Sequence, residues 1–142
     1  MEIRRATTED AAAIAPLLTE LGFPSTAAEV ETRLRGLIAA DETVLVAVDA
    51  GEPIGVVSIH VTPVLHRPTS VGRITAIVVT ERARGRGIGK ALVAAAESHV
   101  ARRGCGLIEL TSNRKLTEAH AFYERLGYER TSHRFKKPLT PG

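Results

Sequence analysis

The sequence predicts an α/β fold (α+β in some classifications), in which helices cover a mixed, mostly antiparallel sheet. Three observations predict it. β-Branched runs alternate with segments of helical periodicity along the chain. Three successive strand-like runs are joined by short connections, and one long helical segment separates two further runs, as in a crossover. The expected order is β-α-α-β-β-β-α-β-α-β-β, with a single domain over residues 1–137 and a short tail at 138–142.

Composition argues against several classes of protein. The net charge is +3 and aromatic residues make up 4%, so the stacking side chains of single-strand binders are scarce. Cys105 is the only cysteine, and no histidine pair has the spacing of metal ligands with a carboxylate. The N-terminus lacks the apolar core of a signal peptide, and no apolar run approaches membrane-spanning length. We therefore expect a cytoplasmic protein without metal, nucleic-acid or membrane partners.

The first 40 residues are expected to form an edge strand and two amphipathic helices. Glu2–Arg5 alternates in polarity as a short edge strand does. Thr7 or Thr8 precedes two acidic residues, an arrangement typical of a helix start. The first helix is expected to stop at Gly22. The apolar faces consist of Ile14, Leu17, Leu18 and Leu21 in the first helix, and of Val30, Leu34, Leu37 and Ile38 in the second.

Three antiparallel strands are expected next. Thr43–Val48 and Pro53–Val61 are β-rich runs joined by a tight connection at residues 49–52. A proline-containing loop, residues 62–70, then leads to the third run, Val71–Val79. Consecutive strands with such short connections form an antiparallel meander.

The remaining chain contains the predicted crossover. A helix over residues 87–104 connects the third antiparallel strand to a run at Leu107–Thr111, which should make these two strands parallel with a right-handed connection. A last helix is expected over Thr117–Leu126, capped by Gly127. Tyr128–Lys137 is expected to form one or two closing strands.

The turn between strand 71–79 and the following helix is a candidate phosphate site. Gly85, Gly87 and Gly89 allow the backbone to approach an anion, and the free N–H groups of a helix start point toward it. The turn is electropositive because of four basic side chains: Arg82, Arg84, Arg86 and Lys90. A turn that serves only helix packing is the alternative, and this basic cluster, with Glu81 as its one acidic member, argues against it.

Two better-known phosphate motifs do not match this turn. A dinucleotide-binding GxGxxG motif would need glycine at a position held by Lys90 or Leu92. A GxxxxGK[ST] loop would need glycine where Arg84 stands and Ser or Thr where Ala91 stands. The pattern that matches is [RQ]-x-x-G-x-[GA], which residues 84–89 spell as RGRGIG.

The chain resembles the GNAT family of acyl-CoA-dependent N-acetyltransferases in four motifs. Besides the glycine-rich turn, the strand before it, the segment IELTSN at 108–113 and the segment AHAFYERLGY at 119–128 match the family in order and spacing. The segment SHRFKK at 132–137 is similar to the final strand of small bacterial members. The resemblance covers about residues 43–137 and implies the GNAT fold.

The resemblance also implies where acetyl-CoA binds. Pantetheine would lie along the end of strand 71–79 as an added β-like segment, and the pyrophosphate would lie on the N–H groups of the following helix start. The strand after the crossover would splay away to admit the cofactor. The implied cofactor-binding residues are Ile77, Val78, Val79, Arg84, Gly85, Arg86, Gly87, Ile88, Gly89, Lys90 and Asn113.

Tyr123 is the implied catalytic residue. It matches the tyrosine that faces the cofactor sulfur in the family, where a phenol can protonate the departing thiolate. Its position beside Phe122 and Leu126 is also that of a core tyrosine. The base that accepts the proton of the amine stays open between His60, Glu81 and a water chain.

The function implied by the resemblance is direct transfer of an acetyl group from acetyl-CoA to a primary amine. A module that binds or senses acyl-CoA without turnover is the alternative, and a basic nucleic-acid-binding domain is a third hypothesis. Leu21–Ala28 and Thr62–Ser70, which are expected to shape the acceptor pocket, lack the carboxylate cluster that a polycationic acceptor would need. Homodimerisation is common in the family and is possible here.

Overall fold

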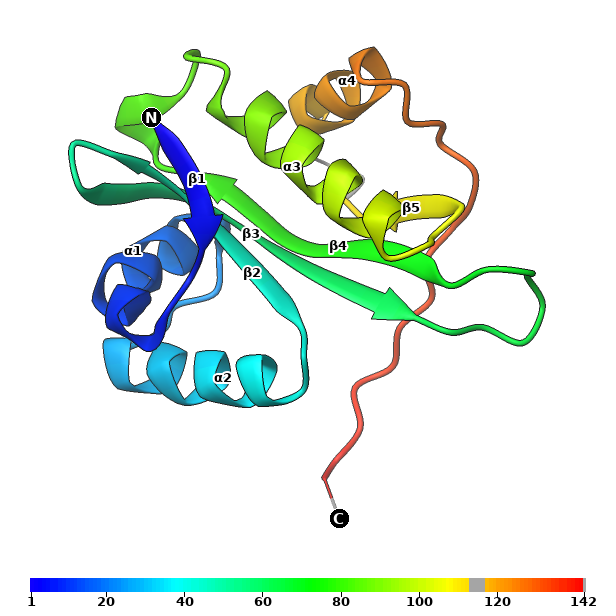
Figure 1. The fold of residues 1–142 in the computed structure, drawn as a ribbon, viewed down its shortest axis with the longest axis horizontal. Coiled ribbons are helices and arrows are strands. Elements are labelled where there is room, and N and C mark those ends of the chain that lie inside the picture. Colours follow the sequence, from blue (N-terminus) through cyan, green and yellow to red (C-terminus); the bar gives the residue numbers. More distant parts are fainter. Residues whose placement is uncertain (113–116, 142) are drawn as a thin grey trace. The chain divides into compact units, whose positions relative to one another are not determined.

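The computed structural model describes residues 1–112 and 117–141, which belong to two compact units, 1–110 and 111–142 (Figure 1). The first unit contains β1 (Glu2–Arg5), η1 (Thr8–Asp10), α1 (Ala11–Leu21), α2 (Ala27–Ala39), β2 (Thr43–Asp49), β3 (Glu52–Thr62), β4 (Val71–Val79), η2 (Glu81–Ala83), α3 (Ile88–Arg102) and β5 (Leu107–Leu110). The second unit contains α4 (Thr117–Arg125). η1 and η2 are short 3-10 turns.

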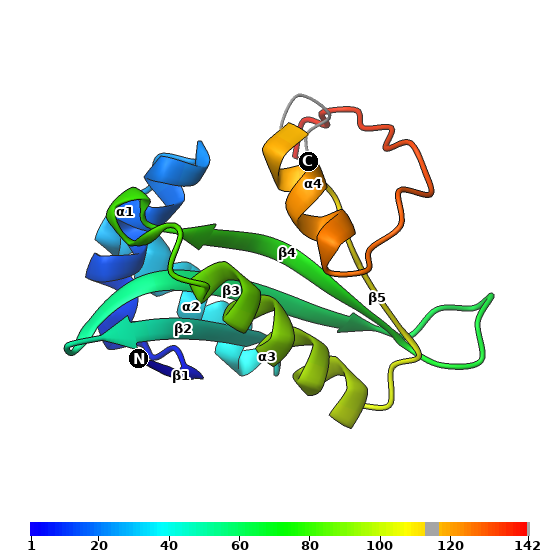
Figure 2. The ribbon, with the colours of Figure 1, turned by 90° about the horizontal axis from the view of Figure 1, so that it is seen from above.

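The sheet has the predicted mixed character. Its strand order is β1-β2-β3-β4-β5. The first four strands pair antiparallel, and β5 pairs with β4 in parallel after the α3 crossover (Figure 2). The predicted α/β fold class is therefore confirmed, with the helix and strand bounds of the first unit within a few residues of those expected.

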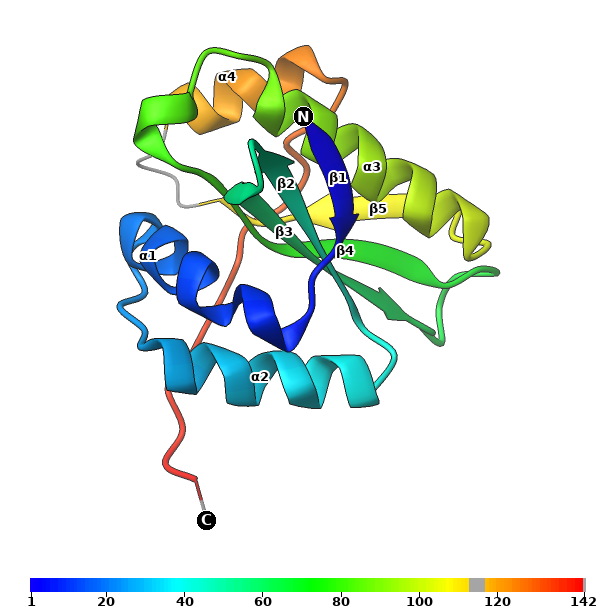
Figure 3. The ribbon, with the colours of Figure 1, turned by 60° about the vertical axis from the view of Figure 1, so that its left-hand side comes forward.

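Two hydrophobic cores lie on opposite faces of this sheet. α1 and α2 cover one face and α3 covers the other (Figure 3). The core under α1 and α2 contains Ile14, Leu17, Val30, Leu34, Val46, Val56 and Val78, among others. The core under α3 contains Ala47, Val57, Ile59, Ile74, Ile88, Leu92 and Val100, among others. Strands covered on both faces lose the simple alternation of apolar and polar residues, which explains their nearly continuous apolar sequence.

The first two helices begin and end largely as predicted. Thr7 and Asp10 form a capping box at η1, and Asp10 also accepts two hydrogen bonds of 2.9 Å from Arg4. Gly22, with φ of 106°, ends α1. The prediction was wrong for Ile38, which is half exposed because the buried stripe of α2 runs through Val30, Leu34 and Leu37, and Ile38 lies about 100° further round the helix.

A close approach between β4 and α3 requires a glycine in the sheet. A Cβ atom placed on Gly72 would lie 2.5 Å from a methyl carbon of Val100 and 2.6 Å from its Cβ. These distances are far inside van der Waals contact. Gly72 therefore allows α3 to pack directly on the backbone of β4.

Two β-bulges change which face the strands present. One places Ile54 as an extra residue on β3 opposite the junction of Ala47 and Val48, and the other places Thr75 as an extra residue on β4. Because of the second bulge, Ile74 belongs to the core under α3 and Val78, four residues later, to the core under α1 and α2. In a regular strand these two side chains would share one face.

The second unit differs from the prediction after its helix. Gly127 adopts φ of 93° after α4, as expected of a C-terminal cap, and the Tyr128 N–H donates to the Tyr123 carbonyl oxygen at 3.0 Å. The expected closing strands over Tyr128–Lys137 are wrong, since residues 129–141 form neither helix nor strand and are exposed. A strand needs a neighbour for its backbone groups, and Phe135 is the only large apolar side chain in the SHRFKK segment to bury against one.

Candidate active site

The central feature of the candidate site is an open edge on β4. β5 pairs with β4 only from Val71 opposite Leu107 to Ile74 opposite Leu110. β4 then continues to Val79, and no described strand pairs with it on that side. The pairing ends at Leu110, the last residue of β5, next to the position where Thr75 forms the bulge of β4 against β3. All of β5, Leu107–Leu110, pairs with β4, so the predicted splaying of these two strands stays a prediction.

Every second residue of β4 directs its backbone N–H and C=O groups to this open edge. The Thr80 N–H donates to the Ile54 carbonyl oxygen of β3 at 2.9 Å, so the residues two apart from Thr80 also face β3. Val78 therefore bonds toward β3, whereas Ile77 and Val79 present their N–H and C=O groups to the open edge. Nε of Arg84 donates to the Val79 carbonyl oxygen at 3.2 Å, which leaves the Val79 N–H available.

The glycine-rich turn after β4 presents free donors. Gly85 and Gly87 have φ of 81° and 78°, and a Cβ atom on either would meet nothing within 4 Å. The first bond into α3 runs from the Ala91 N–H to the Gly87 carbonyl oxygen. Among the described residues, the N–H groups of 85–90 have no acceptor, whereas that of Arg84 bonds the Glu81 carbonyl oxygen. An open row of donors at the positive end of a 15-residue helix is suited to a phosphate.

The basic side chains of the turn are partly neutralised, contrary to the view of the turn as a cluster with one acidic member. Arg82 lies 2.9 Å from Glu52, Arg86 lies 3.4 Å from Asp49, and Arg84 lies 4.0 Å from Glu20. These carboxylates come from the β2–β3 hairpin and from α1, so they are remote from the turn in sequence. Lys90 has no carboxylate partner in the part of the chain that the structure describes.

Glu20 is a contact of this turn that sequence reasoning missed. Its Oε2 accepts from the Thr80 hydroxyl at 2.8 Å and its Oε1 accepts from the Glu81 N–H at 2.9 Å. These two hydrogen bonds, with Arg84 and Arg82 nearby, hold the pKa of Glu20 below its ordinary value. Glu20 occupies a polar position near the end of an amphipathic helix, and nothing in its local sequence indicates a partner 60 residues away.

The second unit contains Tyr123, whose ring packs among aromatic neighbours. Its ring centroid lies 5.3 Å from that of Phe122 in an edge-on arrangement and 6.0 Å from that of Tyr128. Burial raises the pKa of Tyr123 above its ordinary value. The side chains of Phe122 and Tyr123 are half-buried. Asn113 lies outside the described residues.

The two candidate bases lie at different ends of the sheet. His60 stands opposite Arg73, whereas Val79 pairs with Gly55, five residues along β3 and about 17 Å away. Nδ1 of His60 is 2.5 Å from a carboxylate oxygen of Glu42. The structure therefore does not bring His60 to the end of β4. Glu81 is exposed in η2, immediately after that end.

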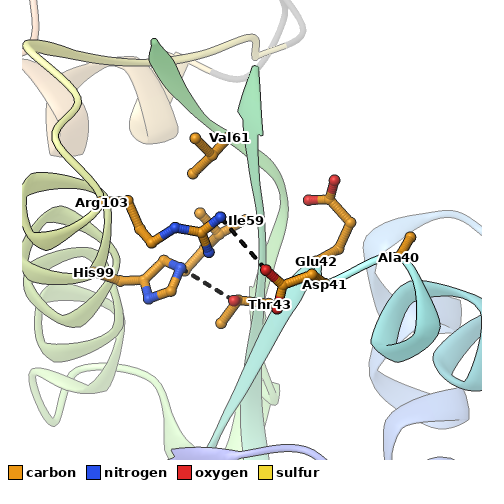
Figure 4. Close-up of a pocket in the computed structure, with 8 residues that line it drawn as sticks. All are labelled: Ala40, Asp41, Glu42, Thr43, Ile59, Val61, His99 and Arg103. Atoms are coloured by element: carbon orange, nitrogen blue, oxygen red, sulfur yellow. Dashed lines mark hydrogen bonds and ion pairs between the residues drawn. The ribbon is translucent and has the colours of Figure 1, made fainter. Parts of the chain in front are cut away.

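A separate polar pocket lies near the C-terminal end of α3 (Figure 4). Nε2 of the buried His99 is 3.1 Å from the Thr43 hydroxyl, and Arg103 is 3.6 Å from Asp41. His99 is eleven residues from Ile88 along the helix, about 16 Å from the glycine-rich turn. This buried, hydrogen-bonded position indicates a structural role for His99.

Two kinds of feature are absent from the described residues, 1–112 and 117–141. No group of three or more His, Cys, Asp or Glu side chains is placed to hold a metal ion there. No helix in these ranges is sufficiently long and apolar to cross a membrane.

The fold and the open strand edge beside a glycine-rich helix start are those of an acetyltransferase. The family model described as the acetyltransferase (GNAT) family matches residues 10–128, and the chain belongs to this family. It is an N-acetyltransferase that transfers an acetyl group to an amine, as the sequence predicted.

Named relatives match nearly the whole chain. It is 33% identical to the aminoalkylphosphonate N-acetyltransferase of Salmonella typhimurium, over 97% of this chain and 91% of that protein. It is 31% identical to the aminoglycoside N(6')-acetyltransferase type 1 of Stenotrophomonas maltophilia, over 98% of this chain and 94% of that protein.

Solved structures share the fold. A putative acetyltransferase from Agrobacterium tumefaciens has a TM-score of 0.89 and 25% identity, covering 98% of this chain and 100% of the other. An aminoglycoside N-acetyltransferase in complex with CoA has a TM-score of 0.86 at 19% identity, covering 97% and 93%, which shows likeness of fold alone.

Proposed function

We propose that this N-acetyltransferase takes its acetyl group from acetyl-CoA bound along the open edge of β4. The observation that carries the proposal is the continuity of that edge, Thr75–Val79, with the free N–H groups of residues 85–90. An extended chain with amide groups can pair with the strand edge, and a pyrophosphate can accept from the helix start. The family uses acetyl-CoA, which agrees with this arrangement.

The described residues fit such a ligand. Ile77 and Val79 have the backbone groups for an added β-like segment, and Val78 supports them from the core. Lys90 has no competing carboxylate among the described residues. Arg84 and Arg86 are paired with Glu20 and Asp49, and each would leave its carboxylate for a phosphate or contact both. The full set of proposed cofactor-binding residues remains Ile77, Val78, Val79, Arg84, Gly85, Arg86, Gly87, Ile88, Gly89, Lys90 and Asn113. When bound, acetyl-CoA supplies a thioester, an activated acyl group with a thiolate leaving group.

We propose Tyr123 as the general acid. The amine nitrogen forms a bond to the acyl carbon, the carbon–sulfur bond breaks, and the phenol proton goes to the departing sulfur. A raised phenol pKa keeps Tyr123 protonated at neutral pH, as this role requires. The incoming amine must lose a proton, and Glu81 or a water chain is better placed than His60 to accept it. A backbone N–H facing the open edge, such as that of Val79, would polarise the carbonyl oxygen.

We propose a small primary amine as the acceptor. Relatives similar over nearly the whole chain are named for aminoalkylphosphonates and aminoglycosides, which are both small amines. The segments expected to shape the acceptor pocket lack a carboxylate cluster, which disfavours polyamines. A cytoplasmic location, expected from the sequence, and a homodimer, possible from the family resemblance, remain predictions.

Two experiments test the proposal. Isothermal titration with CoA should show one site per chain, and its absence would remove the cofactor assignment. Thiol release from acetyl-CoA should then be measured with 2-aminoethylphosphonate, kanamycin, spermidine and an N-terminal peptide. We expect turnover with one of the first two. Binding of CoA without turnover of any amine would favour the alternative, a module that senses acyl-CoA.

A further inference from the structure

The contact between α1 and the β4–α3 turn points to a function for Glu20. Both oxygens of its carboxylate are engaged, one by the Thr80 hydroxyl at 2.8 Å and one by the Glu81 N–H at 2.9 Å. Thr80 is the N-cap of η2 but makes no capping bond with its own side chain. Glu20, from another helix, supplies the acceptor for the first N–H of η2 instead.

Glu20 lies between the two regions that must meet during transfer. Gly22 ends α1 two residues after Glu20, and the exposed Phe23 lies in the segment Leu21–Ala28, which is expected to shape the acceptor pocket. On its other side, Glu20 contacts the residues that directly follow Val79. The structure assigns Glu20 the role of a positioning residue, which fixes the end of the cofactor strand and its turn against the acceptor-side helix. This inference rests on the proposed binding of acetyl-CoA along β4.

The contacts continue from Glu20 to the strand edge itself. Nη2 of Arg84 lies 4.0 Å from Glu20, and Nε of the same guanidinium donates to the Val79 carbonyl oxygen at 3.2 Å. Glu20, Thr80, Glu81 and Arg84 thus hold the last residue of β4 and the start of the glycine-rich turn in one arrangement. A turn held in its binding conformation before the ligand arrives binds it more tightly, because less ordering is required.

The negative charge of Glu20, considered alone, predicts the opposite effect of its removal, namely tighter binding of CoA. Glu20 is an anion beside the arginines of a proposed phosphate site, so its removal would favour CoA if electrostatics dominated. The Arg84–Glu20 pair is long, and its side chains are 57% and 31% exposed, so this effect should be no more than a few-fold. The positioning effect and the charge effect therefore differ in sign and can be separated by substitution.

The test is CoA affinity in four single variants and in the double variant Glu20→Ala/Thr80→Val, measured by titration calorimetry with melting temperatures as a check on folding. Glu20→Ala removes both acceptors and should weaken CoA binding about tenfold. Glu20→Gln can accept from the Glu81 N–H and donate to the Thr80 oxygen, so it should stay within about threefold of wild type. Thr80→Val should weaken binding less, and should add little to Glu20→Ala because the two residues act through one contact. Glu9→Ala, at an exposed glutamate of η1, is the control and should match wild type.

The possible results separate this inference from the proposed function. Wild-type CoA affinity in Glu20→Ala, even with a lowered melting temperature, would overturn the positioning role while leaving the cofactor site intact. Tighter binding in both Glu20→Ala and Glu20→Gln would also overturn it, since charge would then be the controlling factor. Failure of the wild-type protein to bind CoA would remove the proposed function and this inference together.

Discussion

The Thr43 hydroxyl lies 3.1 Å from Nε2 of His99, in the polar pocket between β2 and α3. Both side chains are buried, with exposed fractions of 3% and 7%. The groups around His99 are mostly cationic, since Arg5, Arg103 and Arg102 lower its pKa and only Asp41 raises it. This hydrogen bond therefore connects a titratable ring to the stability of the fold.

The first prediction is a loss of stability in mild acid. Burial, and then the neighbouring arginines, lower the pKa of His99 below its ordinary value of about 6.5. The unfolded chain therefore takes up a proton at higher pH than the folded chain does. The free energy of unfolding should be constant above about pH 6.5 and should decrease as the pH falls from there toward the folded-state pKa.

Urea unfolding between pH 7.5 and 5 measures this effect. His99→Gln should show a weaker decrease over that range, because it removes the titrating group. An equal decrease in wild type and His99→Gln would contradict the assignment. The Arg4–Asp10 pair does not interfere, since the lowered pKa of Asp10 places its effect below about pH 4.

The second prediction concerns the close packing of β4 on α3. Gly72→Ala should destabilise the protein by about 1–3 kcal/mol, because the new methyl group would overlap Val100. Gly36→Ala is the matched control. It lies in α2 with open space around it and should stabilise by up to about 1 kcal/mol through helix propensity. Denaturant midpoints of the two variants should move in opposite directions, and a neutral Gly72→Ala would be inconsistent with the packing described.

A third prediction tests the glycine-rich turn. Gly87→Val should abolish measurable CoA binding, because the side chain would occupy the open surface beside the N–H groups of 85–90. Valine is also strained at φ of 78°, so the control must share that strain. Gly104→Val has nearly the same geometry, φ of 81° with open space, at the opposite end of α3. It should lower stability similarly and leave CoA affinity unchanged, and comparable CoA binding by both variants would contradict the phosphate assignment.

The fourth prediction tests the proposed role of Tyr123. Tyr123→Phe should lower kcat about 10²-fold or more while changing the dissociation constant of CoA less than threefold, since only the proton donor is lost. Phe122→Leu is the control, because it changes a neighbouring apolar ring without removing a hydroxyl. Steady-state thiol release and calorimetry give the two quantities. An unchanged kcat in Tyr123→Phe would indicate a purely structural tyrosine.

Local sequence patterns predicted the meander, the crossover helix and the parallel strand. Each depends on signals within one segment, such as the β-branched run of β4 or the glycines at the start of α3. The closing strands were predicted from the same kind of signal and are absent. A strand is stabilised by its neighbours, and the exposed Phe135 shows that this segment has little to bury against one.

The contacts of the site were the least predictable part. The spacing of the glycines predicts the glycine-rich turn, whereas its link to Glu20 spans 60 and 61 residues and joins a polar helix position to a hydroxyl and a backbone N–H. The acidic partners of Arg82 and Arg86 could not be predicted either, since they come from the β2–β3 hairpin, which is remote from the turn in sequence. The chemistry of His60 makes it a candidate base, and only the register of β3 on β4 shows how far it lies from Val79.

Beyond the bulge at Thr75, β4 should be more sensitive to a change of its register on β3 than to the identity of its apolar residues. A substitution of one apolar residue for another leaves apolar side chains pointing into both cores. Deletion of Thr75 would remove the bulge and leave Ala76 opposite Ser58 and Val78 in its core. Insertion of a single residue after Ala76 would instead rotate every following side chain to the opposite face, so Val78 would leave its core and Ile77 and Val79 would turn their backbone groups toward β3. The length of β4 beyond the bulge is therefore expected to tolerate no change, and new acceptor specificities must arise in the loops around it.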